Sequence, residues 1–164
     1  MKDLAGQVEL NIEQATHIAR AMFKVADAEE GVHELERQMI DSFYLGCCRE
    51  AGVEPEDLSK NPFDGEAARR ALNTPELQDI TLHSCLLVGY ADGQCSPMER
   101  AAIEEIANSL GVDSSRFSSI EKDVQRAMLE HFSNIKVFQD AVHEIGKRLG
   151  LSQEEVDEIL KSNT

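Results

Sequence analysis

Carboxylate side chains gather in two short stretches of the sequence, and their types and spacing are the ones best suited to chemistry. The first stretch holds five acidic residues, Asp27, Glu29, Glu30, Glu34 and Glu36. Between Asp27 and Glu36 there is no lysine or arginine. The second combines the turn dipeptide Asp92-Gly93 with Glu99. Crowded carboxylates repel one another, and a hard divalent cation relieves this by binding their oxygens. We therefore predict a metal site formed by Asp27, Glu36, Asp92 and Glu99, with Ca²⁺, Mg²⁺, Mn²⁺ or Zn²⁺ as candidate ions.

Glu30 and His33 form a second, weaker pair of candidate ligands. Their spacing is that of the Glu-x-x-His pairs in di-iron helical bundles. Such a centre needs two pairs in mid-helix and two further glutamates. Glu30 and His33 instead fall in a turn or at a helix start, which weakens the di-iron interpretation.

A purely structural interpretation of the same carboxylates stays open. Glu99 is the fourth residue of a Ser-x-x-Glu capping box, so its side chain could serve only the backbone N–H of Ser96. Acidic residues near a helix N-terminus also stabilise the helix dipole without any ligand. The spacing differs from that of an EF-hand loop, so the sequence leaves both metal ligands and helix caps as alternatives.

The overall composition disfavours several classes of protein. The chain has 164 residues and a formal net charge of -15, which repels nucleic acid and anionic membrane surfaces. Phosphate-binding glycine loops, nucleophile elbows and H-E-x-x-H motifs are absent, so we expect no enzymatic activity. The four cysteines include no C-x-x-C pair and are expected to be reduced. The start of the chain resembles no signal peptide and no stretch is long enough to insert into a membrane, so we expect a cytoplasmic protein.

Apolar residues recur every three or four positions along nearly the whole chain, which predicts an all-α fold. We expect one compact bundle of about seven to eight helices, with residues 1–164 as a single domain. The segment from Pro75 to Ala91 is apolar on nearly every side, which predicts a central helix. Helix starts are predicted at the capping boxes that begin with Ser96, Ser118 and Ser152. Helix ends are predicted at Gly52, Gly111 and Gly150.

Two parts of the chain look like copies of one helical hairpin. The first copy covers about residues 8–53 and the second about residues 75–117, and the helices of residues 118–164 follow. Each copy has an Ala-Asp pair at the end of one helix and a Glu-Arg pair at the start of the next, at Glu36-Arg37 and Glu99-Arg100. Such a duplication would bring the two acidic turns into comparable settings.

The second copy resembles a known signature. Ala91-Asp92-Gly93, Glu99, Ile103 and the Ile-Ala-Asn-Ser-Leu-Gly-Val-Asp run of residues 106–113 are similar to the tellurite-resistance TerB family. The similarity covers roughly Val8 to Phe117 and is strongest from Pro75 to Phe117. The first copy departs from the pattern because it has Asp27-Ala28 in place of Asp-Gly.

The resemblance implies a non-enzymatic stress-response protein whose partners belong to the tellurite-resistance system at the inner face of the membrane. Tellurite is an anion, so a protein this acidic is expected to act indirectly, through metal handling or the assembly of partners. One alternative is a metal-free interaction module, whose acidic turns dock a basic surface or whose apolar helix faces form a homodimer. A third, less favoured, is an enzyme with a carboxylate-bridged pair of metal ions.

Overall fold

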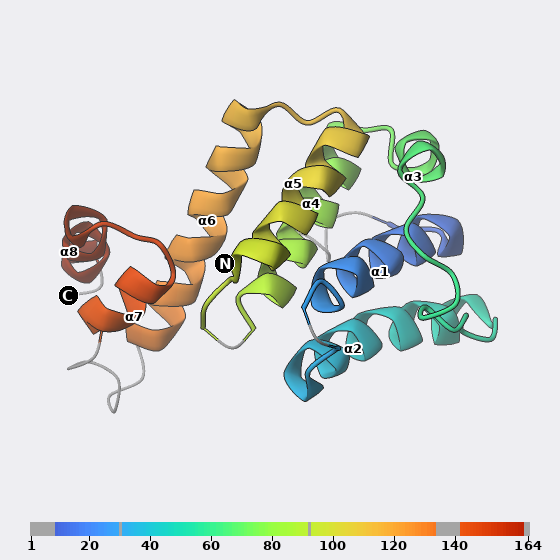
Figure 1. The fold of residues 1–164 in the computed structure, drawn as a ribbon, viewed down its shortest axis with the longest axis horizontal. Coiled ribbons are helices and arrows are strands. Elements are labelled where there is room, and N and C mark those ends of the chain that lie inside the picture. The colour runs from blue at the N-terminus through green and yellow to red at the C-terminus, as the bar shows by residue number, and fades with distance from the viewer. Residues whose placement is uncertain (1–8, 30, 92, 134–141, 163–164) are drawn as a thin grey trace.

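The computed structural model describes residues 9–29, 31–91, 93–133 and 142–162, and these parts of the chain form eight helices and no strand (Figure 1). The predicted all-α fold is therefore confirmed. The helices are α1 (Ile12–Ala26), α2 (Glu34–Ala51), α3 (Gly65–Ala71), α4 (Pro75–Gly89), α5 (Pro97–Leu110), α6 (Ser114–Ser133), α7 (Val142–Arg148) and α8 (Gln153–Ser162). Part of the helix predicted around residues 135–149 lies outside the described residues.

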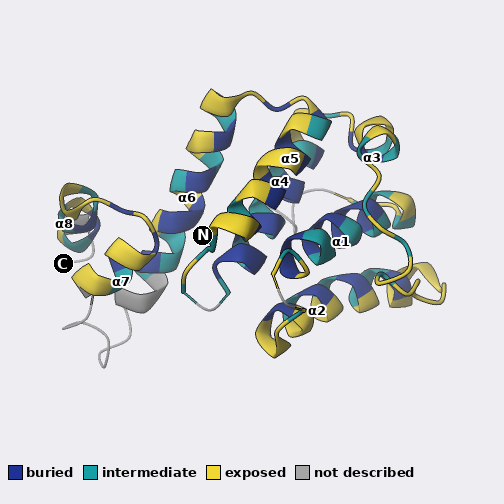
Figure 2. Ribbon diagram, in the orientation of Figure 1, coloured by how far each residue is buried: buried dark blue, intermediate teal, exposed yellow. Residues whose placement is uncertain are grey.

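The two predicted hairpins are present as α1–α2 and α4–α5, and they pack against each other mainly through α1 and α4. Helix α4 is apolar on nearly every side and contacts α1, α2, α5 and α6. The predicted central position of this helix is therefore confirmed. Large apolar side chains such as Ile18, Leu82 and Leu86 are fully buried there. Figure 2 shows this burial on the faces where the helices meet, while much of the outer face of α2 stays exposed.

The predicted caps are confirmed at two of three helix starts. Ser96 and Ser152 each begin a capping box, with glutamates three residues later returning a hydrogen bond to the serine backbone N–H. The box predicted at Ser118 is wrong, because α6 already begins at Ser114 and Ser118 lies inside it. The carboxylate of Asp113 takes the capping role instead, and accepts from the backbone N–H of Arg116 at 2.8 Å.

Left-handed glycines end the helices where the sequence predicts them. Gly52 and Gly111 are the C-caps of α2 and α5, with φ angles of 69° and 79°. Gly150 has a φ of 91° between α7 and α8. Only glycine adopts such angles without strain, so each of these residues reverses the chain at low cost.

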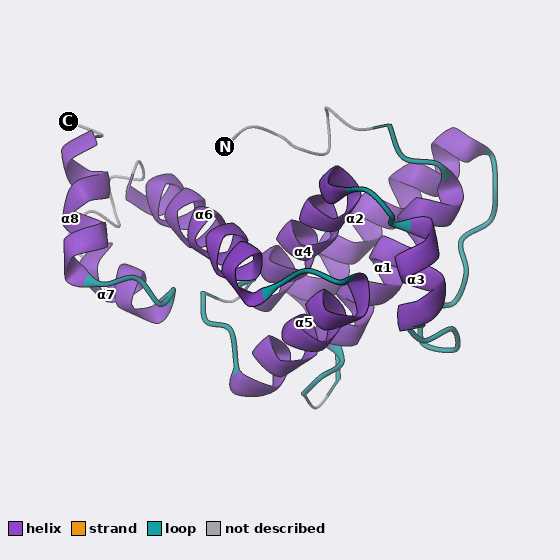
Figure 3. Ribbon diagram, turned by 90° about the horizontal axis from the view of Figure 1, so that it is seen from above, coloured by secondary structure: helices purple, strands orange, loops and turns teal. Residues whose placement is uncertain are grey.

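The helices after residue 113 pack onto one side of the second hairpin. In Figures 1 and 3, α6 lies beside α4 and α5, and α7 and α8 lie farther out. Arg100 on α5 forms an ion pair with Glu121, and Lys122 forms one with Glu155 at 3.1 Å. One contiguous cluster of buried apolar residues extends from Ile18 in α1 to Ile159 in α8.

Candidate functional site

The two acidic turns start from helix ends that touch each other. A methyl group at Gly89, the last residue of α4, would lie 3.8 Å from Cγ1 of Val25 near the end of α1. It would also lie 3.1 Å from Sγ of Cys95 and from Cδ1 of Ile103, so the absence of a side chain permits this close packing. Both turns accordingly lie at the same end of their hairpins in Figures 1 and 3.

Two of the predicted metal ligands occupy the same structural position in the two copies. Glu36 and Glu99 are the third residues of α2 and α5, with exposed fractions of only 5% and 8%. Oε1 of Glu36 accepts from the backbone N–H of His33 at 3.2 Å, and Oε1 of Glu99 accepts from that of Ser96 at 3.3 Å. The structural alternative is thus seen directly, since both carboxylates cap the helix that carries them.

The other predicted ligands are arranged differently. Asp27 is exposed at the end of α1, where its backbone N–H donates to the carbonyl of Phe23 at 2.9 Å. His33 is exposed and precedes the first residue of α2. Asp92 and Glu30 lie outside the described residues.

The described donor atoms do not form a metal site by themselves. Within residues 9–29, 31–91, 93–133 and 142–162, no three His, Cys, Asp or Glu side chains come close enough to hold one ion. A divalent cation of the Ca²⁺ type needs six to eight oxygens, which Glu36 and Glu99 cannot supply alone. Joint coordination by Asp27, Glu36, Asp92 and Glu99 stays a prediction.

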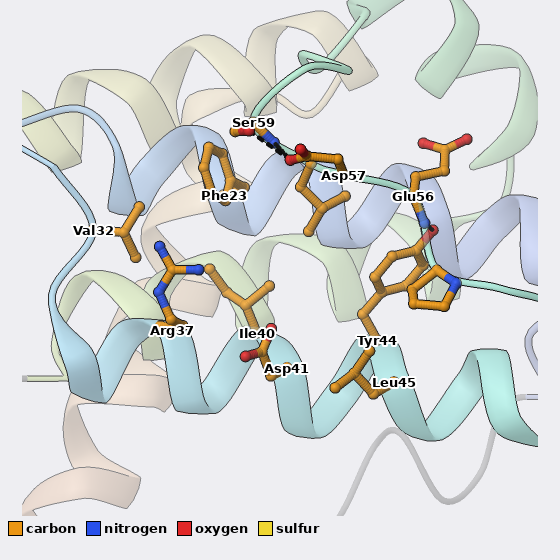
Figure 4. A pocket seen from close by; sticks show the side chains of 12 residues that line it. Phe23, Val32, Arg37, Ile40, Asp41, Tyr44, Leu45, Glu56, Asp57 and Ser59 are labelled. Carbon is orange, nitrogen blue, oxygen red and sulfur yellow. Dashed lines mark hydrogen bonds between the residues drawn. The ribbon is translucent and has the colours of Figure 1, made fainter.

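A cavity of about 250 Å³, which the sequence did not indicate, lies between α1, α2 and the segment of residues 55–59 (Figure 4). Its wall is largely apolar and includes Phe23, Val32 and Ile40, while the guanidinium of Arg37 stands beside Val32. This cavity borders the first acidic turn, because Val32 belongs to that turn.

Most polar groups of this cavity are engaged within the protein. Arg20 binds the carboxylate of Glu56 through hydrogen bonds of 2.7 to 3.2 Å. The backbone N–H of Glu56 donates to the hydroxyl of Tyr44 at 3.2 Å. Asp57 accepts from both the backbone N–H and the hydroxyl of Ser59. The bonds of Arg20 and Tyr44 to Glu56 hold this segment against the first hairpin, so the polar groups of the cavity stabilise the fold.

A wider hollow, which we call the α2–α4 groove, lies on the flank of α2 that faces α4. It measures about 620 Å³. Its wall is made of Met22, Leu35, Gln38, Met39, Ser42, Phe43, Ser84, Leu87 and Ala91. No charged side chain is among these residues, and Leu35 is 55% exposed.

His17 and His83 occupy buried or half-buried structural positions. Burial lowers the pKa of both imidazoles below 6.5, and the positive charge of Arg20 adds to the lowering at His17. The Nδ1 atom of His17 is buried without a hydrogen-bond partner among the described residues. Both histidines are therefore neutral in the fold near pH 7.

In the described residues these features define an all-helical module with two similarly capped helical hairpins and a surface groove. Residues 54–122 match the family model described as Tellurite resistance protein TerB, so this segment of the chain is of the TerB type. The match contains the signature of residues 91–113 and leaves the first hairpin and α7 and α8 outside. Neither a curated protein nor a solved structure matches the chain. No helix of the described parts is long and apolar enough to cross a bilayer.

Proposed function

We propose that this protein is a non-enzymatic module of a tellurite-resistance or related stress-response system, and that it acts as a scaffold for a protein partner. The TerB match of residues 54–122 supports the link to tellurite resistance. The formal net charge of -15 supports an indirect role, because such a surface repels the tellurite anion.

The observation that carries the scaffold interpretation is the use of Glu36 and Glu99 as caps. Both side chains are withdrawn from solvent, and one oxygen of each is directed at the backbone at the start of its own helix. That engagement ties each carboxylate to the start of its own helix and takes up part of the hydrogen-bonding and ligand capacity that a metal ion would need. Glu36 and Glu99 are thus better suited to capping their helices than to binding an ion.

The proposal is tested by growth of cells on tellurite. Deleting the gene should lower the tellurite concentration that stops growth, and the wild-type gene should restore it. A Glu36→Gln/Glu99→Gln variant keeps an acceptor oxygen at both caps and removes both charges, so it should restore growth equally well. Unchanged growth after deletion would overturn the tellurite assignment. Failure of a folded glutamine variant would show that the charges themselves are needed.

Melting temperatures of the purified protein distinguish a metal-free scaffold from a metal-binding module. If the turns hold no ion, Ca²⁺, Mg²⁺, Mn²⁺ and Zn²⁺ should change the melting temperature of the wild type and of Asp92→Ala/Glu99→Ala by the same small amount. A rise confined to the wild type would instead assign Asp92 and Glu99 to a metal site.

A further inference from the structure

The α2–α4 groove is an apolar surface on an otherwise strongly acidic protein. Leu35, Met39 and Phe43 line it from α2, each four residues after the one before, so they lie on one helix face. Leu87 lines it from α4, and Met22 of α1 also contributes. Among these residues Leu35 is exposed and the other four are partly or fully buried, so the floor of the groove is apolar.

The hollow continues along α2 beyond the groove itself. A neighbouring depression is lined by Phe43, Cys47, Glu50 and Ala51, together with residues 9–12 before and at the start of α1. Phe43 belongs to both hollows, so the surface runs from Leu35 to Ala51. At 1.5 Å per residue this stretch of α2 is about 24 Å long, which is the length of a helix of about 16 residues.

Charge around the groove points to a basic occupant. Glu34 is exposed beside Leu35, and its carboxylate accepts a hydrogen bond from the side chain of Gln38 in the groove wall. Glu9 and Glu50 line the continuation of the groove, while the oppositely charged Arg37 and Asp41 line the other cavity. The wall contributed by α4 is uncharged, because residues 80–91 contain no Asp, Glu, Lys or Arg. A second copy of this chain would bring another charge of -15 to the surface, and anionic lipid headgroups would also be repelled.

We infer that the α2–α4 groove binds an amphipathic helix of a partner protein, with apolar side chains facing the groove and lysine or arginine residues along its edges. The binding mode is that of a helix in an apolar groove, with anchors at three- and four-residue spacing. The inference rests on the proposed scaffold function and names the chemistry of the partner. Apolar contact with Leu35, Met39 and Phe43 supplies affinity, and the acidic rim supplies attraction and orientation.

The structure offers a closely matched control for this site. Leu35 and Met98 are both the second residue of their helices, and their exposed fractions are 55% and 58%. Only Leu35 lines the groove. Leu35→Asp and Met98→Asp therefore add the same charge at equivalent exposed positions, where an acidic residue also suits the helix N-terminus.

The test measures fluorescence anisotropy of a labelled synthetic helix of about 16 residues, with leucines at helical spacing and lysines elsewhere, added to the full chain. Leu35→Asp should weaken binding roughly tenfold or more, because it removes an apolar anchor from the groove. Met98→Asp should bind like the wild type. Ser84→Arg, placed on the opposite wall, should weaken binding as well, since its charge opposes the peptide. Circular dichroism and melting temperature show whether each variant is folded.

Specific outcomes would overturn the inference. Equal binding by Leu35→Asp and Met98→Asp would show that the peptide binds outside the groove. Equal binding of a scrambled peptide with the same composition would show that net charge alone causes the binding. A dimer in sedimentation that Leu35→Asp dissolves would assign the groove to a second copy. Binding to anionic vesicles that Leu35→Asp abolishes would assign it to a membrane. None of these results bears on growth with tellurite, so the groove and the proposed function fail separately.

Discussion

Replacing the cap residues of α5 tests whether Glu99 is a structural or a ligand-binding carboxylate. The side chains of Ser96 and Glu99 exchange two hydrogen bonds with each other's backbone N–H groups, at 3.1 and 3.3 Å. Ser96→Ala removes one of these bonds, Glu99→Ala removes the other, and Glu99→Gln preserves an acceptor oxygen without the charge. The three variants therefore separate loss of the cap from loss of the charge.

The expected sizes follow from the capping geometry. Loss of an N-cap serine costs about 1 kcal/mol of stability. Loss of the Glu99 bond costs about 0.5–1.5 kcal/mol, because the backbone N–H of Ser96 then loses its partner. Glutamine is a regular third residue of capping boxes, so Glu99→Gln should stay within about 0.5 kcal/mol of the wild type. In a protein of this size, 1 kcal/mol corresponds to a change in melting temperature of roughly 2–4 °C.

Urea denaturation followed by circular dichroism gives the free energy of unfolding of each variant. The double variant Ser96→Ala/Glu99→Ala should lose less than the sum of the single losses, since both residues serve one cap. The reasoning is refuted if Glu99→Gln is as unstable as Glu99→Ala. Such a result would mean that the charge of Glu99, and not its acceptor oxygen, stabilises the turn. Glu36→Gln repeats the test in the first hairpin.

Two further predictions concern glycines and histidines, both measured by urea denaturation. Gly146→Ala should destabilise by about 1–3 kcal/mol because its Cβ would overlap Cγ2 of Val156, and Val156→Ala should relieve part of that loss. Gly46→Ala, in α2 with no atom within 4 Å of the new Cβ, should instead stabilise by up to about 1 kcal/mol. Burial lowers the pKa of His17 and His83 below the 6.5 of the unfolded chain, so unfolding takes up protons and stability should fall as pH drops below about 6.5. Replacing both histidines by glutamine should flatten this fall, and an unchanged pH profile would contradict it.

The sequence predicted those parts of the fold that depend on neighbouring residues. The partners Ser96 and Glu99 are three positions apart, so their hydrogen bonds could be anticipated from the sequence. The start of α6 was misplaced because two cap signals compete there. Asp113 lies closer to the end of α5 and begins the helix, which leaves Ser118 inside it.

The α2–α4 groove and the cavity beside Tyr44 gave no such local signal. The groove depends on the lateral placement of α2 against α4, and its walls come from residues 35–43 and 84–91. The cavity depends on the clamp between Arg20 and Glu56, which are 36 positions apart. Periodicity shows which face of a helix is apolar, but it does not show which part of that face a neighbouring helix covers.

The different neighbours of the two hairpins explain why the groove opens along α2. The two copies share a buried third-position glutamate and an exposed apolar residue before it, at Leu35 and Met98. They differ in their neighbours, because α5 also packs against α3, while α2 packs mainly against α1 and α4. In the second copy the apolar face of the hairpin is used to build the core with later helices. In the first copy part of that face is left at the surface, and a partner helix with basic edges would complete the packing that α3 and α6 provide around the second hairpin.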